Sequence, residues 1–308
     1  MANYIIRKLL YSILVLIGVI TVTFSLMYVI PGDPARLMLG QRADIASIDA
    51  VRKQLGLDDP LYVQYGRFMV KAVQGDLGRS YSSNRDVLKT ILETFPATAL
   101  LAVTALIISS IIGILIGVIS SVRPYTWTDN LSMLLALFGI SFPPFALGLI
   151  MALVFGAWLK WFPISGYVNN GMIYLVLPML TLALRPLSII ARLTRSSMLD
   201  VLGQDYVRTA RAKGVSEWKV IIKHALRNAM NPVLTTISAW LAALLGGTFF
   251  IEYIFNWPGI GLLAINSILS LDFPMIQGTV LFTAVIFIIV NMIVDIMYAF
   301  LDPKVKLS

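Results

Sequence analysis

The residues of this chain that could do chemistry are few, and most lie in one polar stretch. Residues 205–232 read DYVRTARAKGVSEWKVIIKHALRNAMNP and include the only histidine, His224. The chain has no cysteine, which excludes disulfides and thiolate metal sites. It also has no GxxxxGK[ST] phosphate loop, no HExxH and no GxSxG. We therefore predict no catalytic residue, no metal site and no cofactor in this chain, so the energy for any work must come from a partner.

Two ionisable residues stand out because they lie within long apolar runs. Asp295 follows Asn291 by one helical turn, and Arg185 precedes Pro186. An ionisable residue inside a membrane is a functional candidate by default. Asp295 is close to the end of its run, so we favour a structural role, in which it reaches the interface or pairs with a neighbouring arginine. Arg185 has two interpretations, snorkelling or pairing, and no motif assigns a substrate contact to either residue.

The composition explains why such runs exist. The 308 residues are 58% hydrophobic and only 13% charged, with a mean hydropathy of +0.84. Soluble domains carry about 25% charged residues, so the chain is predicted to be an integral membrane protein. Its first apolar run lacks a small-residue cleavage site, which favours a retained anchor over a signal peptide.

Six apolar stretches are long enough to cross a bilayer about 30 Å thick. We place them at 9–30, 97–122, 131–158, 172–191, 233–252 and 278–300. An even number of spans puts both termini on one side.

The basic residues select that side. On the N-terminal side they are Arg7, Lys8, Arg123, eight residues from Arg192 to Arg227, Lys304 and Lys306. The two short loops on the opposite side contain only Lys160. The positive-inside rule then predicts that both termini and the polar stretch are cytoplasmic, in the cell membrane. The same asymmetry accounts for the pI near 9.7 without nucleic-acid binding.

Four regions follow from these spans. They are 1–30, the N-terminus and first span; 31–96, an extracytoplasmic segment; 97–301, a five-span core with the cytoplasmic segment 192–232; and 302–308, a cytoplasmic tail. The segment 31–96 begins with Pro31-Gly32-Asp33-Pro34, a turn that ends the first helix. Its amphipathic pieces predict a folded cap or interfacial helices.

Small residues and prolines mark several spans. Rows with four-residue spacing occur in the second span, at Ser109, Gly113 and Gly117, and in the fifth, at Ser238, Ala242 and Gly246 with Ala239, Ala243 and Gly247 alongside. Such rows favour close helix packing, and the fifth span could also line a passage. Pro143 and Pro144 in the third span, and Pro178 and Pro186 in the fourth, predict kinks that serve either shape or gating.

The polar stretch 205–232 is predicted to form a helix–Gly–helix elbow. Helix-favouring residues lead to Gly214, which suits the left-handed end of a helix. Ser216 is placed to cap a second helix, with Glu217 in its first turn, and Asn231-Pro232 marks the start of the fifth span. The expected stripes on that second helix are apolar at Trp218, Ile222, Ala225 and Ala229 and basic at Lys219, Lys223 and Arg227.

Three functions fit a basic elbow on the cytoplasmic face: contact with anionic lipid, a DNA-binding helix-turn-helix, or docking of a cytoplasmic protein. The third is favoured because the elbow resembles the E-A-A-x-x-x-G loop of the inner-membrane subunits of ATP-binding-cassette importers. Counting back from Gly214, RTARAKG fills that frame with Arg208, Thr209 and Ala210. The glutamate and first alanine of the general motif are replaced, as in the dipeptide, oligopeptide, glutathione and nickel branch.

Other segments extend this resemblance over nearly the whole chain. They are PGDPARL at 31–37, QLGLDDPLYVQY at 54–65, GDLGRS at 75–80, ARLTRSSMLDVL at 191–202, FNWPGIG at 255–261 and VDIMYAFLDPK at 294–304. The long segment after the first span resembles the first of the two permease subunits in this branch. The resemblance implies an all-α fold with six transmembrane helices, of the type I importer kind.

The resemblance also implies partners and a mechanism. A second, similar permease would complete the pore, two cytoplasmic ATPases would bind ATP and Mg²⁺, and an extracytoplasmic binding protein would deliver substrate. ATPase closure would push the elbow and switch the pore from inward- to outward-facing. The residues implied in that coupling are Arg208, Thr209, Ala210, Arg211, Ala212, Lys213, Gly214, Val215, Ser216, Glu217 and Trp218.

We therefore predict a permease subunit for di- and oligopeptides that is not itself an enzyme. The alternatives are a permease for glutathione or for nickel and metal chelates, and more remotely a polytopic membrane enzyme.

Overall fold

The computed structural model describes residues 2–29, 34–39 and 44–301, and all its named elements are helical. The α-helices are α1 (Ala2–Val29), α2 (Pro34–Leu39), α3 (Ile45–Leu55), α4 (Leu61–Val73), α5 (Val87–Val122), α6 (Trp127–Ser141), α7 (Pro144–Met151), α8 (Val176–Leu202), α9 (Asp205–Ala212), α10 (Glu217–Lys219), α11 (Arg227–Gly246), α12 (Phe249–Ile254), α13 (Ile260–Leu269) and α14 (Phe273–Leu301). The π-helices are η1 (Ala152–Trp158) and η4 (Val220–Leu226), and the 3₁₀ helices are η2 (Val168–Asn170) and η3 (Met172–Leu175). The predicted tail 302–308 and most of the turn at 31–34 lie outside the described residues.

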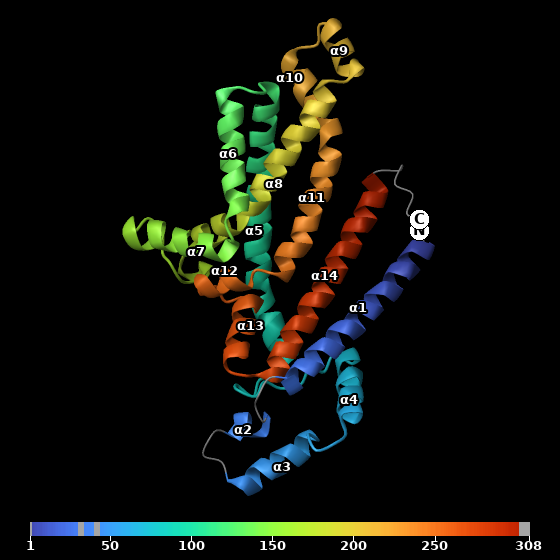
Figure 1. Ribbon diagram of the computed structural model, residues 1–308, viewed down its shortest axis with the longest axis vertical. Coiled ribbons are helices and arrows are strands. Elements are labelled where there is room, and N and C mark those ends of the chain that lie inside the picture. The colour runs from blue at the N-terminus through green and yellow to red at the C-terminus, as the bar shows by residue number, and fades with distance from the viewer. Residues whose placement is uncertain (1, 30–33, 40–43, 302–308) are drawn as a thin grey trace.

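Long helices run along the molecule, with α9 and α10 at one end and α2–α4 at the other (Figure 1). Five stretches are long and apolar enough to cross a membrane: Ile6–Ser25, Val87–Val122, Met172–Leu202, Glu217–Gly246 and Phe273–Ile296. A sixth is formed by α6 with α7 and η1 if this bent pair counts as one span. The predicted all-α membrane fold is confirmed.

The third span is broken rather than kinked, so the prediction of one helix over 131–158 is wrong. The stretches Trp127–Ser141 and Pro144–Trp158 meet at 106°. Between them Phe142 has an extended backbone. Pro143 and Pro144 have no N–H to donate to the carbonyls four residues earlier, Gly139 and Ile140, so the helical ladder cannot continue. Two consecutive prolines therefore break the helix instead of only bending it. We call the turn between α6 and α7 the corner.

The core of the bundle is the contact between α5 and α8, and glycine makes it close. A Cβ at Gly113 would lie 2.9 Å from the Leu187 carbonyl oxygen. One at Gly117 would lie 2.5 Å from the Cβ of Thr194. These contacts confirm that the small-residue row of the second span is a helix-packing face.

The predicted boundary at 96/97 falls inside α5. The helix starts ten residues earlier, where the Asp86 carboxylate accepts a hydrogen bond from the Lys89 N–H at 2.8 Å. Pro96 lies within α5 and does not end it. Hydropathy places the span later than the start of the helix, because the first turns of α5 mix apolar residues with Lys89, Thr90, Glu93 and Thr94 and begin at a capping residue.

The fifth span is also shifted. Its helix ends at Gly246, not at 252, and the following short α12 holds a buried carboxylate, Glu252. Glu252 accepts hydrogen bonds from the N–H of Gly261 at 2.6 Å and the hydroxyl of Thr248 at 2.5 Å. The indole of Trp257 donates to the Ala97 carbonyl at 2.8 Å. The FNWPGIG segment thus fastens the chain between α11 and α14 onto α5.

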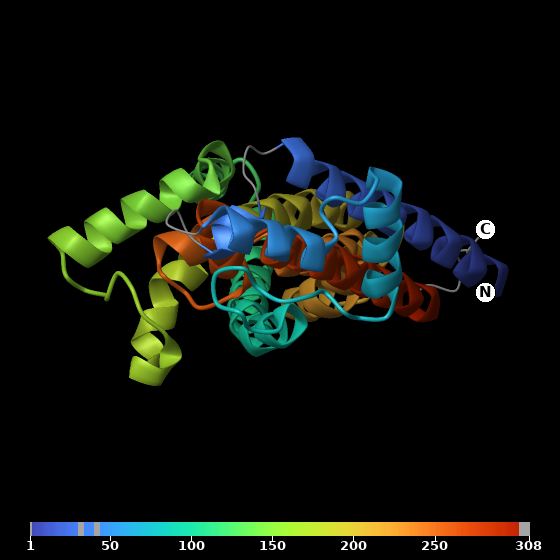
Figure 2. The ribbon, with the colours of Figure 1, turned by 90° about the horizontal axis from the view of Figure 1, so that it is seen from below.

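The segment 31–96 contains α2, α3 and α4, which lie across the end of the bundle opposite α9 (Figures 1 and 2). The buried carboxylate of Asp272, just before α14, fixes the chain that follows α4. It accepts hydrogen bonds from the hydroxyls of Ser80 and Ser82 and from the Tyr81 N–H. This end is therefore tied directly to the last span.

The first and last spans lie side by side, and Lys8 in α1 forms an ion pair with Asp295 in α14. The structural role predicted for Asp295 is supported, although its partner is a lysine rather than an arginine.

Candidate functional site

The predicted coupling residues lie at one extremity of the molecule (Figure 1). Most of them are on a short connection that we call the elbow, residues 203–216, and Glu217 and Trp218 begin the helix that follows it. The elbow contains α9 and the turn after it. It follows α8 directly and precedes α10, η4 and α11, which continue as one helical stretch from Glu217 to Gly246. The predicted segment 192–232 is therefore mostly the ends of two spans, and only the elbow connects them.

Gly214 has the backbone conformation predicted for it. Its φ is +77°, a region that a residue with a Cβ enters at a cost. Its N–H donates to the Arg211 carbonyl at 2.9 Å, and the Val215 N–H donates to the Ala210 carbonyl at 3.2 Å. These two bonds form a Schellman motif, which satisfies the last carbonyls of α9. Gly214 thus ends α9 and reverses the chain toward α10.

A small core holds α9 against η4. Val207 and Ala210 of α9 are buried with Val220, beside the half-buried Val215. Outside this core the Tyr206 hydroxyl accepts a hydrogen bond from the Asn228 amide at 2.8 Å. Ala210, the alanine retained from the family frame, is therefore small because it packs against a neighbouring helix.

The rest of the predicted set forms the outer surface of the elbow and of the helix start beside it. The exposed members are Arg208, Thr209, Arg211, Ala212, Lys213, Gly214, Ser216, Glu217 and Trp218. Trp218 is 72% exposed, which is unusual for a side chain that prefers burial. Cationic, hydroxyl and aromatic groups thus face outward on a compact projection.

One ion pair braces this surface. The Arg211 guanidinium donates to the Glu217 carboxylate at 2.6 Å across the Gly214 turn. Hydrogen bonding to Glu217 raises the pKa of Arg211 above its usual value. The pair fixes the angle between α9 and α10 without burying either side chain.

Two details of the predicted second helix are wrong. Ser216 occupies the N-cap position but its side chain makes no capping hydrogen bond. The buried face comprises Val220, Ile221, Ala225 and Ala229, whereas Trp218 and Ile222 are exposed. The cause is η4, because a π-helical turn contains an extra residue and rotates the face that follows.

The predicted basic row Lys219, Lys223 and Arg227 is exposed. Asn231-Pro232, predicted to mark the start of a span, lies inside α11.

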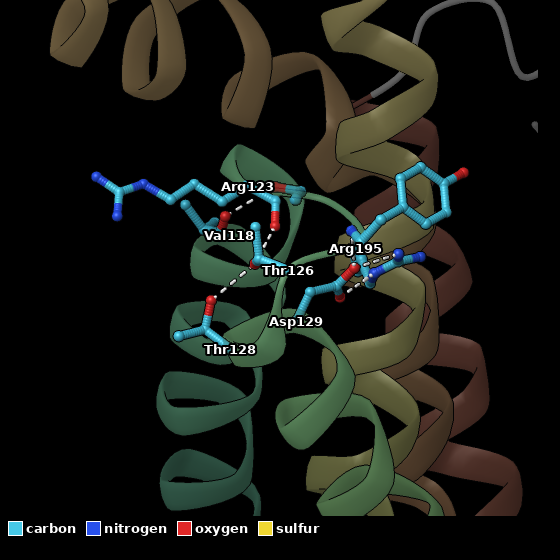
Figure 3. A network of polar contacts seen from close by, with 8 residues as sticks. Val118, Arg123, Thr126, Thr128, Asp129 and Arg195 are labelled. Carbon is cyan, nitrogen blue, oxygen red and sulfur yellow. Dashed lines mark hydrogen bonds and ion pairs between the residues drawn. The ribbon is translucent and has the colours of Figure 1, made fainter.

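The prediction missed a buried ion pair near the base of the elbow. Asp129, 1% exposed, accepts two hydrogen bonds of 2.6 Å from the Arg195 guanidinium, and a third of 2.8 Å from the Tyr125 N–H (Figure 3). The pair joins the start of α6 to α8, and Arg195 lies seven residues before the end of α8. Asp129 was visible in the sequence as an acidic residue in the first turn of a helix, but nothing there named its partner.

Among the residues that the structure describes, no group of three or more histidine, cysteine or acidic side chains is placed to hold a metal ion. The lone His224 is half-buried in η4, and its carbonyl accepts a hydrogen bond from the Asn228 amide at 2.9 Å.

Comparison with known proteins assigns the family. Residues 110–307 match the binding-protein-dependent transport system inner membrane component, and residues 1–102 match the N-terminal component of such systems. The glutathione transport system permease protein GsiC of Escherichia coli K12 is 44% identical over 306 residues, which is 99% of each chain. GsiC of Salmonella paratyphi A has the same identity and coverage. The chain therefore belongs to the family of binding-protein-dependent transport system inner membrane components, the non-catalytic permeases of ATP-binding-cassette importers.

Proposed function

We propose that this importer permease takes up short peptides, of which the tripeptide glutathione is one. Two observations support a peptide cargo. The full-length similarity is to permeases named for glutathione transport, and the RTARAKG frame resembles the peptide, glutathione and nickel branch. The relatives described above favour glutathione at least as strongly as di- or oligopeptides. They give no support to nickel or a metal chelate.

The elbow is the proposed docking site for a cytoplasmic ATPase. The observation that carries this proposal is the outward-facing set of side chains on a connection between two long helices. Because α8 ends where the elbow begins and α10 starts where it ends, a force on the elbow acts on both helices at once. Trp218 offers an aromatic anchor of the kind that dominates protein interfaces, and Arg208 and Lys213 add charge.

The proposed stroke passes from the elbow into the bundle. The α8 helix packs along α5 and α6, and α11 packs on α14. Closure of the ATPases would push the elbow, tilt α8 and α11, and switch the pore between inward- and outward-facing states. The chain itself would bind neither ATP nor Mg²⁺, because both belong to the two ATPase subunits.

In this arrangement the elbow and both termini face the cytoplasm, and α2–α4 face the other side of the cell membrane. The proposed partners are a second, similar permease that completes the pore and an extracytoplasmic binding protein that delivers peptide. The exposed apolar surfaces of the spans would contact lipid and the second permease. No nucleic acid is involved.

The test is Gly214→Pro in the complete importer. Proline cannot adopt a positive φ and lacks the N–H that bonds Arg211, so the elbow should be distorted and ATP-dependent peptide uptake lost, with insertion unchanged. Gly203→Ala is the matched control, because Gly203 has φ −78° and the atoms nearest to an added Cβ are 3.7 Å away. Normal uptake by the proline variant would contradict the docking proposal.

A further inference from the structure

Arg185 is a charged residue far from both ends of a transmembrane helix. It lies nine residues after the start of α8 and seventeen before its end, which is about 14 Å and about 26 Å at 1.5 Å per residue. Its side chain is exposed on the surface of the chain. Among the described residues none forms a hydrogen bond or ion pair with it, so of the two interpretations, snorkelling or pairing, the pairing finds no partner within that part of the chain.

Arg185 lines a cavity of about 340 Å³ between α6, α7, α8, α11 and α12. Of the described residues that line it, Arg185 alone is charged. The other lining residues are apolar except for Thr181, and the largest side chains are Phe142, Phe145, Trp240 and Phe250. Cavities of about 300–1,000 Å³ that combine apolar walls with few polar groups are typical of ligand sites.

The corner between α6 and α7 forms one wall of this cavity, because Gly139, Phe142, Pro143 and Pro144 all line it. Non-helical backbone at membrane depth is tolerated where it lines a water-filled cavity. A charged side chain at that depth has the same requirement. Two independent features, the broken helix and the cation, therefore place water or a polar ligand at the same point.

Ala243 of α11 and Gly247, just after α11, line the cavity. Gly246 is directed at α14, where an added Cβ would lie 3.6 Å from Phe287. Gly246 and Gly247 thus have different neighbours, and Ala243 borders both sides. The row containing Ala243 and Gly247 leaves space in front of Arg185 that larger side chains would fill.

We propose that Arg185 binds the carboxylate of a peptide as it passes through the permease. This rests on the peptide cargo proposed above. A guanidinium forms two parallel hydrogen bonds with a carboxylate, and these are stronger where water is largely excluded. The apolar walls can contact peptide side chains of many kinds, because such contacts need no hydrogen-bond geometry. The cavity therefore selects the free carboxyl group that short peptides share, not a particular sequence.

The experiment measures uptake by the complete importer in proteoliposomes. The substrate is whichever of glutathione, dialanine and trialanine the wild-type complex takes up fastest, supplied as the free acid and with every carboxylate amidated. The amidated form is used at a concentration that gives a measurable wild-type rate. Each variant is expressed as a ratio to wild type for each form, so selection by the binding protein cancels.

Arg185→Gln should lower uptake of the free acid about tenfold or more, the size expected for loss of a charge-assisted pair, and leave uptake of the amide nearly unchanged. Arg185→Lys, which keeps the charge without the planar fork, should fall between. Arg192→Gln is the matched control, since Arg192 lies seven residues along the same helix, is exposed, and does not line the cavity. It should affect neither form.

An equal loss for acid and amide in Arg185→Gln would overturn the proposal, because it would show that Arg185 supports the pore or pairs with the second permease. Unchanged uptake of both forms would overturn it as well. Basal ATPase activity of the assembled complex confirms that each variant folds and assembles. A wild-type complex that imports none of the peptides would instead refute the peptide cargo itself.

Discussion

Two of the arginine–carboxylate pairs at or near the elbow share the same shortest distance but differ in burial. Asp129–Arg195 and Arg211–Glu217 both have a closest contact of 2.6 Å. Asp129 is 1% exposed and Arg195 21%, whereas Arg211 and Glu217 are 42% and 55% exposed. The first pair joins separate helices within the frame, by which we mean α5, α6 and α8. The second joins α9 of the elbow to the start of α10, on the surface.

The comparison distinguishes a pair that stabilises the packed helices from a pair on the surface proposed to contact a partner. Removing one member of a buried pair leaves a charge without its partner, whereas an exposed pair contributes little to stability because water and salt screen it. Mutations in the frame should therefore mainly lower the free energy of unfolding, whereas mutations in the elbow should mainly lower transport. The following predictions test that division by the effect on unfolding free energy, in decreasing order.

Asp129→Ala should have the largest effect. It leaves the Arg195 guanidinium mostly buried and unpaired, at a cost of about 3–5 kcal/mol. The measurement is the midpoint of denaturant or thermal unfolding of the purified chain in detergent or nanodiscs. Glu217→Ala, beside the elbow, is the matched control, and equal shifts of the midpoint in the two variants would remove the distinction between the pairs.

Gly117→Ala should destabilise the frame by about 1–3 kcal/mol through overpacking. The added Cβ would lie 2.6 Å from the Ala191 carbonyl oxygen and 2.5 Å from the Cβ of Thr194, so α5 and α8 must separate. Gly18→Ala in α1 is the control, since an added Cβ there meets nothing within 4 Å. If both variants unfold at the same midpoint, α5 and α8 can move apart at little cost, and the prediction is wrong.

Gly214→Ala should cost about 1–2 kcal/mol, the penalty of a left-handed backbone for a residue with a Cβ. No atom lies within 4 Å of that Cβ, so strain is the only cause. ATP-dependent uptake should fall by more than the stability change explains. Gly214→Asn should keep more stability and more uptake than Gly214→Ala, because asparagine tolerates this conformation. A less stable or less active asparagine variant would argue against the turn geometry.

Glu217→Gln should have the smallest effect on stability, about 0–1 kcal/mol. The pair is exposed, so its contribution should decline further as salt is added. Uptake measured at low and high salt shows whether the brace between α9 and α10 matters for transport. A midpoint shift as large as that of Asp129→Ala would place this pair with the frame.

Hydropathy, charge and helix-ending residues predicted much of this protein. Each of the six predicted apolar runs overlaps a stretch that is long and apolar enough to cross a membrane, if the bent pair counts as one. The left-handed conformation of Gly214 was predicted from the residues around it. The errors share a cause. The start of α5 depends on a cap at Asp86 outside the apolar run, and the buried face beyond Glu217 depends on a π-helical turn. Neither feature changes the average pattern from which spans are predicted.

The sequence by itself determined the properties that depend on composition and on neighbours along the chain: a membrane protein, a left-handed turn at Gly214, and a family frame around it. Only the tertiary structure decided which distant residues meet. It paired Asp129 with Arg195 and Lys8 with Asp295, and it placed Arg185 beside the corner made by Pro143 and Pro144. The physical reason is that pairing and cavity formation depend on how helices pack, which no single stretch of sequence specifies.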